Sequence, residues 1–262
     1  MRCILINFLA LISIAVNAQT DSLNYKSKWQ VKVGAGTHLS FPKLRGINTF
    51  SDELIGYSGS AAYIQPMSVS YFWKKRWGME FAFQFLQKND LAARAERFER
   101  FVGQRYDNEY FVDAYSGDEL YGGTPPVTQG WLALVYRYEK GKFLVYPKVL
   151  VGLISYEPGL GNAWLKKINA NNIASLGISP ENPLLERGMF GASSTFGYKL
   201  SKRFFLNAEL MLSHFNNNVV YNYTFKDIST GIENKEIISY KKNIYIMNVG
   251  IGLTYVFKYK DK

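Results

Sequence analysis

The chain has 262 residues, 16% of them aromatic, and 31 Lys and Arg against 21 Asp and Glu give it a formal net charge of +10. Cys3 is the only cysteine, which excludes a disulfide framework and disfavours cysteine-based metal centres and nucleophiles. The basic residues are spread over short connections such as Lys74-Lys75-Arg76 and are not gathered in one stretch, so we predict no nucleic-acid partner. We predict no metal site and no cofactor.

The N-terminus has the pattern of a secretory signal peptide. Met1 and Arg2 precede an apolar run from Cys3 to Val16, and small residues follow up to Ala18. The run is too short for a membrane-spanning helix. We therefore predict a signal peptide over residues 1–18, a periplasmic leader over 19–29, one barrel domain over 30–258 and a basic tail over 259–262.

Alternation of large apolar residues with small or polar ones predicts β-strands along the rest of the chain. In chain order these strands cover residues 30–41, 60–73, 77–85, 129–138, 143–156, 187–200 and 203–215, before a last strand from Tyr245 to Phe257. The connections alternate between long and short, the short ones lying at residues 74–76, 139–142 and 201–202. Residues 42–59, 87–128, 157–186 and 216–240 are expected to be long loops.

The last strand also carries a local motif. Its sequence from Asn248 to Tyr255 resembles the C-terminal insertion signal of bacterial outer-membrane barrels, a polar residue, a glycine, a hydrophobic residue and an aromatic residue at set spacing. The residues that match it, followed by a further aromatic, are Asn248, Gly250, Leu253, Tyr255 and Phe257. The resemblance implies recognition by the barrel-insertion machinery.

The strand pattern as a whole resembles the small eight-stranded OmpA/OmpX type of outer-membrane β-barrel. It predicts an all-β fold, an eight-stranded antiparallel up-and-down transmembrane barrel with long extracellular loops. Tyr71, Trp73, Trp77, Tyr136, Tyr138 and Tyr255, near the short turns, are expected to form an aromatic girdle. The alternative is a soluble lipocalin-like barrel, but the face opposite the aromatics is rich in Gly, Ser and Thr and suits a narrow lumen better than a soluble exterior.

Charged residues on the small, polar face are expected to meet inside the barrel. These residues are Lys32, Glu80, Arg137, Lys148 and Glu209. An unpaired ion in such an interior is costly, so we predict an ion-pair network, with Lys148 near Glu209 and Glu80 near Arg137. The network is interpreted as a structural plug, and the alternative is a gated ion path in a small channel.

The two histidines raise the possibility of an enzyme. Ser213-His214-Phe215-Asn216 is similar to the His-x-Ser element of outer-membrane lipid A deacylases, but Asn216 stands where their nucleophilic serine would be. Ser213 and His214 are adjacent in a strand and are expected to point to opposite faces. We predict that His214 lies at the lipid headgroup level and that His38 faces the lumen.

The second and third long connections are expected to form an ordered extracellular platform. Apolar spacing predicts a helix from Leu91 to Val102, and helix-like spacing recurs at Trp164, Leu165, Ile168, Ile173 and Leu176. The two apolar faces are expected to pack on each other. Tyr110, Phe111 and Tyr115 would then form a binding surface for protein or glycan. Acidic residues near them, from Asp107 to Glu119, match no calcium motif and are expected to be solvated.

These observations predict a non-enzymatic outer-membrane β-barrel protein with an ordered extracellular loop cap and a structural or partner-binding role. The alternatives are a lipid-modifying enzyme of the deacylase type and a small channel. The expected location is the bacterial outer membrane. The expected partners are outer-membrane lipid and lipopolysaccharide, the insertion machinery, and an extracellular protein or glycan.

Overall fold

The computed structural model describes residues 27–42, 59–87, 91–115, 127–158, 161–168 and 170–257. The predicted signal peptide, most of the leader, the tail and the first long loop (43–58) lie outside these ranges. The strands are β1 (Trp29–Pro42), β2 (Gly59–Phe72), β3 (Trp77–Gln87), β4 (Tyr110–Tyr115), β5 (Val127–Tyr136), β6 (Tyr138–Lys140), β7 (Phe143–Tyr156), β8 (Gly161–Lys167), β9 (Ile173–Pro180), β10 (Leu185–Lys199), β11 (Phe204–Asp227) and β12 (Glu233–Val256), and the helix is α3 (Leu91–Arg105). Within the described ranges, no helix has the length and apolar content needed to cross a bilayer.

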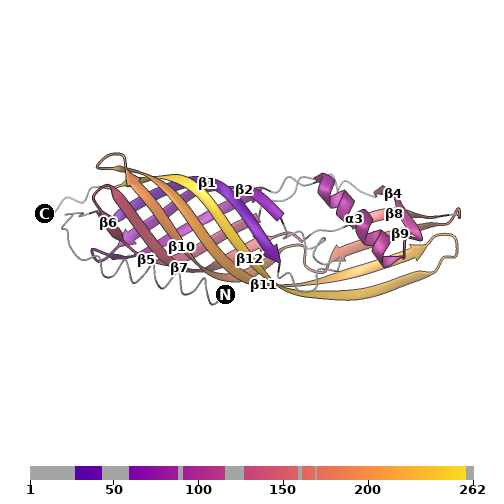
Figure 1. The fold of residues 1–262 in the computed structure, drawn as a ribbon. Coiled ribbons are helices and arrows are strands. Elements are labelled where there is room, and N and C mark those ends of the chain that lie inside the picture. Colours follow the sequence, from indigo (N-terminus) through magenta and orange to yellow (C-terminus); the bar gives the residue numbers. More distant parts are fainter. Residues whose placement is uncertain are drawn as a thin grey trace.

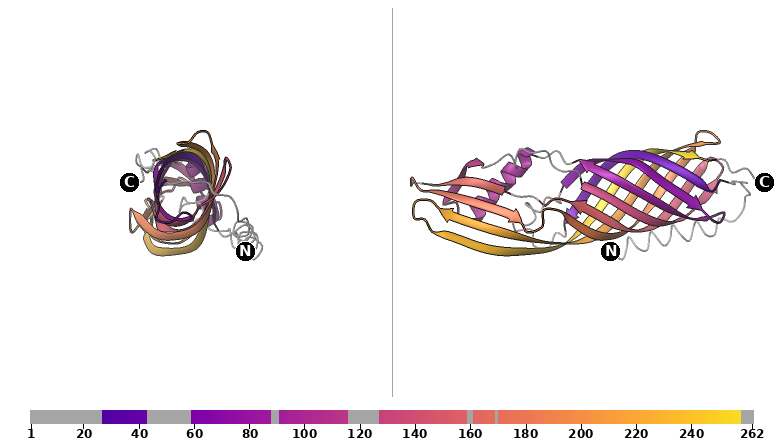
Figure 2. Two further views of the ribbon diagram at one scale, coloured as in Figure 1. Left: turned by 90° about the vertical axis from the view of Figure 1, so that its left-hand side faces the viewer. Right: turned by 180° about the vertical axis from the view of Figure 1, so that it is seen from behind.

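Eight of the strands close into a barrel, as Figures 1 and 2 show. The order β10-β7-β5-β3-β2-β1-β12-β11 is closed by pairing of β10 with β11, and every pairing is antiparallel. This confirms the predicted fold class, and six of the predicted strands lie within a few residues of their observed bounds, whereas β11 and β12 extend further than predicted. β6 is a short addition that pairs with β7.

The period of two in the sequence divides the barrel into an outer and an inner face. Large apolar residues such as Val149, Leu206 and Ile251 point outward and are exposed, while polar residues such as Gln30 and Ser68 point inward and are buried. Glycines allow close packing of the interior. At Gly250 a Cβ atom would collide with the hydroxyl group of Tyr63, so the tyrosine side chain can extend from β2 over β1 to β12 only because this position has no side chain.

The last long connection is not a loop, and this expectation was wrong. β11 and β12 each continue for 24 residues, pairing from Phe204–Tyr255 near the short turn to Lys226–Glu233 at the tip. Beyond the barrel their outward positions become polar, which hides the alternation, while Val219, Tyr221 and Tyr223 remain buried on the inner side. Figure 1 shows the hairpin reaching well past the barrel end.

The second and third long connections add to this hairpin. β9 pairs with the outer part of β11, β8 with β9, and β4 with β8, so that a five-stranded sheet (the distal sheet) stands beyond the barrel. The predicted helix is confirmed as α3, but the helix-like spacing from Trp164 to Leu176 does not form a helix. These residues form the β8–β9 hairpin, in which Leu165 and Leu176 are buried and Trp164 and Ile173 are exposed on the opposite face. Two short alternating strands joined by a turn mimic helical spacing.

Candidate functional site

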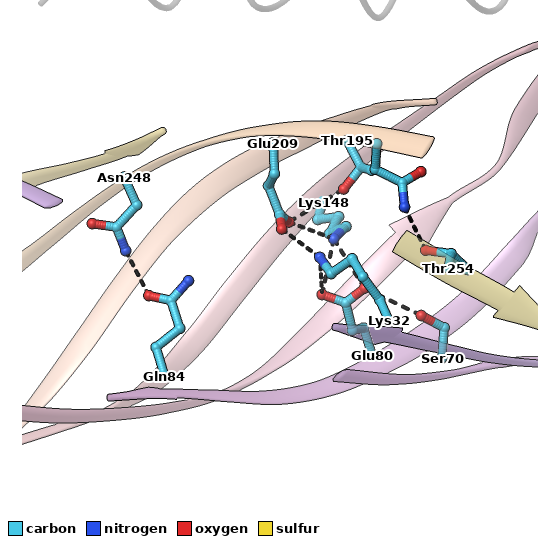
Figure 3. Close-up of polar contacts among 10 residues, drawn as sticks. Lys32, Ser70, Glu80, Gln84, Lys148, Thr195, Glu209, Asn248 and Thr254 are labelled. Carbon is cyan, nitrogen blue, oxygen red and sulfur yellow. Dashed lines mark hydrogen bonds and ion pairs between the residues drawn. The ribbon is translucent and has the colours of Figure 1, made fainter. Parts of the chain in front are cut away.

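Two lysines and two glutamates meet in the middle of the lumen, and we call them the central charge cluster (Figure 3). Lys148 Nζ lies 2.8 Å from Glu80 Oε1 and 2.7 Å from Glu209 Oε1. Lys32 Nζ also binds Glu209 Oε2, and it lies 3.9 Å from Glu80 Oε1. The four side chains come from β1, β3, β7 and β11, so the cluster ties opposite walls of the barrel together.

The cluster is balanced in charge and supplied with hydrogen bonds. Ser70 Oγ donates to Glu80 at 3.1 Å, and Thr195 Oγ1 donates to Glu209 at 3.2 Å. Glu209, the least buried member, has a side chain that is only 11% exposed. Two cations and two anions at these distances neutralise each other, which is what a buried ionic group requires.

The structure places Arg137 outside this cluster, and the expected pairing with Glu80 was wrong. Glu80 is opposite Ala133 in the ladder, so Arg137 lies four residues nearer the short turns. There its guanidinium donates to Lys75 O at 2.6 and 2.9 Å and stacks over the Phe72 ring at 4.1 Å. The expected pairing assumed that residues at equal distances from the turns lie at equal depth, which neglects the stagger between neighbouring strands.

A second lumenal group near the short turns was missed in the sequence. Glu139 accepts hydrogen bonds from Tyr146 Oη at 2.8 Å and from Lys199 Nζ at 2.9 Å, and Arg137 Nε lies 3.9 Å away. Glu139 had been assigned to a turn, yet it points inward. The inward direction of Glu139 could have been read from the sequence, because Glu139 lies two residues after Arg137 and therefore on the same face of the strand.

Above the central charge cluster, toward the distal sheet, lies a layer of neutral polar side chains. His38 Nδ1 is 2.7 Å from Asn248 Oδ1, and Asn248 Nδ2 donates to Gln84 Oε1 at 2.8 Å, as Figure 3 shows for the amide pair. The predicted lumenal position of His38 is therefore observed. Of the insertion-signal residues, Asn248 and Gly250 face the lumen, and the three apolar and aromatic ones face outward.

Ser213 and His214 do not form a catalytic pair. Ser213 is buried on the lumenal face, whereas His214 lies on the outer face between the rings of Phe190 and Tyr245, with centroid distances of 5.0 and 4.8 Å. Consecutive strand residues point to opposite sides, so the hydroxyl cannot reach the imidazole within this segment. Among the described residues, no three His, Asp or Glu side chains are grouped as ligands for a metal ion.

The distal sheet and α3 together form what we call the distal cap, whose buried apolar residues continue the apolar cluster of the barrel interior. Phe98, Phe101 and Val102 of α3 are buried against the sheet, with Leu165 and Tyr221 in the same core. A Cβ atom at Gly161 of β8 would collide with the Phe98 ring, so the glycine permits this contact.

The C-terminal end of α3 is fixed to the β11–β12 hairpin. The helix stops where Asp107 and Asn108 adopt positive φ angles of 49° and 59°, which Asp and Asn tolerate better than most residues. Tyr106 and Tyr223 are joined through their hydroxyl groups, and Arg105 Nη2 lies 2.5 Å from Glu236 Oε2. Burial, followed by the bond to Tyr223, raises the pKa of Tyr106 well above its ordinary value of about 10.

The predicted binding surface is divided by the structure. Tyr110 packs into the cap against Tyr106 and Phe225, at centroid distances of 5.4 and 5.7 Å, whereas Phe111 points outward. Tyr115 belongs to β4, but its side chain lies outside what the structure describes. Beside Phe111 the same outer face carries the exposed side chains of Trp164 and Ile173, which had been expected from the sequence to pack against the other loop.

No protein-family model matches the sequence, and no significant match to a curated protein was found. Among solved structures the chain is similar to a major outer membrane protein from Thermus thermophilus, with TM-score 0.41 and 12% identity over 89% of this chain and 100% of that one. It is also similar to Neisserial surface protein A, with TM-score 0.42 and 11% identity over 87% and 97% of the two chains. A third is the outer membrane protease OmpT from Escherichia coli, with TM-score 0.38 and 8% identity over 91% and 99%. Identity and TM-score are low in each case.

Proposed function

We propose that this chain is an outer-membrane β-barrel protein that holds an ordered binding platform outside the cell and has no enzymatic role. The membrane location is supported first by a girdle of eight aromatic residues, one on each barrel strand beside the short turns. These residues pair across neighbouring strands with ring centroids 4.6–5.4 Å apart, as Trp29–Tyr71, Trp77–Tyr136, Phe143–Tyr198 and Phe204–Tyr255. Aromatic belts of this kind form where a barrel wall meets the membrane–water interface.

The outer face above the girdle supports the same proposal. On β1 the outward residues run from Trp29 to Phe41. Among the described residues of the eight barrel strands, the outward positions over this height hold no Asp, Glu, Lys or Arg below Glu186, which stands at its upper edge, twelve residues from Tyr198. Twelve residues at about 3.3 Å each, tilted by about 40°, rise about 30 Å, which is the thickness of the hydrocarbon core. The short turns would then face the periplasm and the distal cap the exterior.

The side chains inside the lumen support a structural role for the barrel interior and not ion conduction. The central charge cluster places mutually paired side chains from β1, β3, β7 and β11 inside the lumen, and the Tyr63 side chain lies over Gly36 and Gly250 of the two neighbouring strands. An ion entering from either side would have to displace a paired partner at the energetic cost of leaving a buried charge alone. We therefore infer that the ion pairs serve as a plug.

The distal cap is the single observation that carries the binding proposal. A barrel needs only short connections to close, yet this chain places a five-stranded sheet and a helix with buried apolar residues between them beyond the membrane level. The outer face of the distal sheet carries Phe111, Trp164 and Ile173 in exposed positions, on strands paired by backbone hydrogen bonds. Exposed aromatic side chains held on a rigid element are typical of surfaces that bind protein or glycan.

Two experiments test this function. Heat-modifiable gel mobility and recovery in the outer-membrane fraction test the barrel, and recovery in the soluble periplasm would refute it. Binding to immobilised glycans and to extracellular matrix proteins tests the platform with the paired change Phe111→Ala and Trp164→Ala. We expect at least tenfold weaker binding, since each ring is worth more than about 1 kcal/mol at an interface. Val149→Ala on the lipid-facing wall is the control and should leave binding unchanged.

A further inference from the structure

The three short turns of the barrel carry seven exposed cations and no exposed carboxylate. They are Lys74, Lys75 and Arg76 after β2, Lys140 and Lys142 before β7, and Lys202 and Arg203 before β11. Glu139, beside the second turn, points into the lumen and is bonded to Lys199. Seven charges at one end account for a large share of the net charge of +10.

One cation from each turn contacts a tyrosine of the aromatic girdle. Arg76 Nη1 donates to Tyr136 Oη at 3.0 Å, and Arg203 Nη1 donates to Tyr255 Oη at 3.5 Å. Lys142 Nζ lies 5.9 Å from the centre of the Tyr198 ring. The side chains of these tyrosines lie on the outer wall of the barrel. The cations are therefore held against that wall, at the level of the girdle.

We propose that these turn cations form a ring of binding sites for the phosphate groups of anionic phospholipids in the leaflet around the short turns. The proposal rests on the proposed function, because it takes the girdle as the membrane interface. Guanidinium and ammonium groups bind phosphate oxygens through charge-assisted hydrogen bonds, and a neighbouring tyrosine places its hydroxyl among the headgroups. The ring fixes the barrel height and orientation by contacts at three points around the wall.

The other end of the molecule lacks this arrangement in its described part. Three cations of the distal cap are paired with carboxylates, as Arg105–Glu236, Lys167–Glu109 at 3.2 Å and Lys235–Glu233 at 3.0 Å. Acidic cell-wall peptides are the competing partner for the turn cations. The contacts with outward tyrosines favour lipid, because a cell-wall ligand would be reached from beneath the turns and not along the wall.

The test measures lipid retention by the purified barrel in detergent with native mass spectrometry. Phosphatidylglycerol and phosphatidylcholine with identical acyl chains are supplied in equal amounts. We expect phosphatidylglycerol to be retained about fivefold over phosphatidylcholine for each occupied site, the ratio that one basic residue near an anionic surface provides. The triple change Arg76→Gln, Lys142→Gln and Arg203→Gln should remove most of that preference. The matched control removes three exposed cations of the distal cap, Lys226→Gln, Lys235→Gln and Lys241→Gln, and should keep it.

Equal retention of the two lipids by the parent protein would overturn the proposal, and so would an equal loss in both triple variants. Cosedimentation with purified peptidoglycan, lost in the turn variant without any lipid preference in the parent, would assign the cations to the cell wall and also overturn it. If the turn variant does not fold, the test is made on the parent protein alone. Its preference for phosphatidylglycerol must then fall at about 0.5 M salt, because salt screens the attraction between the turn cations and the lipid phosphates. Heat-modifiable mobility of the parent is measured alongside, so that failure of the barrel itself is recognised separately.

Discussion

Replacing Glu209 by alanine is the sharpest test of the central charge cluster. Glu209 is the partner of both lysines, at 2.7 Å from Lys148 Nζ and in direct contact with Lys32 Nζ. Without its carboxylate, two buried cations share Glu80 alone, and Lys32 lies 3.9 Å from it. One positive charge in the middle of the lumen is then uncompensated.

The expected loss of stability is about 3–5 kcal/mol, the cost of breaking a buried ion pair by removing one partner. The double variant Glu209→Ala with Lys32→Met returns the cluster to one cation and one anion, so we expect it to recover at least about half of the loss. Glu236→Ala, which removes the exposed partner of Arg105, is the control and should cost less than about 1 kcal/mol.

The assay is urea unfolding of the barrel in lipid vesicles, followed by tryptophan fluorescence and by heat-modifiable gel mobility. Equilibrium midpoints are compared at constant denaturant slope, so that a shift in midpoint reports stability. If Glu209→Ala and Lys148→Ala both leave the midpoint unchanged, the charges are hydrated and the cluster does not hold the barrel walls together. A loss that Lys32→Met fails to relieve would mean that the damage comes from the cavity and not from charge.

Three further predictions concern other parts of the chain. Gly250→Ala should cost about 1–3 kcal/mol because its methyl group collides with Tyr63, and Tyr63→Ala in the same chain should relieve part of this cost in the urea assay. Phe98→Ala, which empties a fully buried site in the distal cap, should expose α3 to trypsin on intact cells while heat-modifiable mobility persists; unchanged proteolysis would show that the helix does not depend on this contact. Since the folded-state pKa of Tyr106 is raised, its neutral form stabilises the cap fully below pH about 10, and this contribution is lost as pH rises above that value. Proteolysis of the cap should therefore increase above pH about 10 in the parent and less steeply in Tyr106→Phe, and tyrosinate absorbance at an ordinary pKa for Tyr106 would contradict the argument.

The barrel strands could be predicted closely because their signal is local. A strand in a membrane wall meets lipid on one side and a packed lumen on the other, so every second residue is constrained, and runs such as Phe143–Tyr156 reveal both faces. The signal for the helix α3 is also local, because its apolar residues recur at helical spacing. Beyond the membrane this constraint relaxes, because water accepts polar and small residues on the outer face. The extension of β11 and β12 past Phe215 was therefore hidden in the sequence.

The sequence by itself determined which residues face inward and which face lipid, since side-chain direction in a strand follows from residue parity alone. Only the tertiary structure decided which inward residues meet. Strand tilt and stagger move Arg137 away from Glu80 and bring Lys32, Lys148 and both glutamates together from four separate strands. The distal sheet was decided in the same way, because β4, β8 and β9 acquire their partners only where the β11–β12 hairpin offers an edge. The face to which a residue points depends only on its position along its own strand, whereas the residues it meets depend on how all eight strands are aligned in the closed barrel.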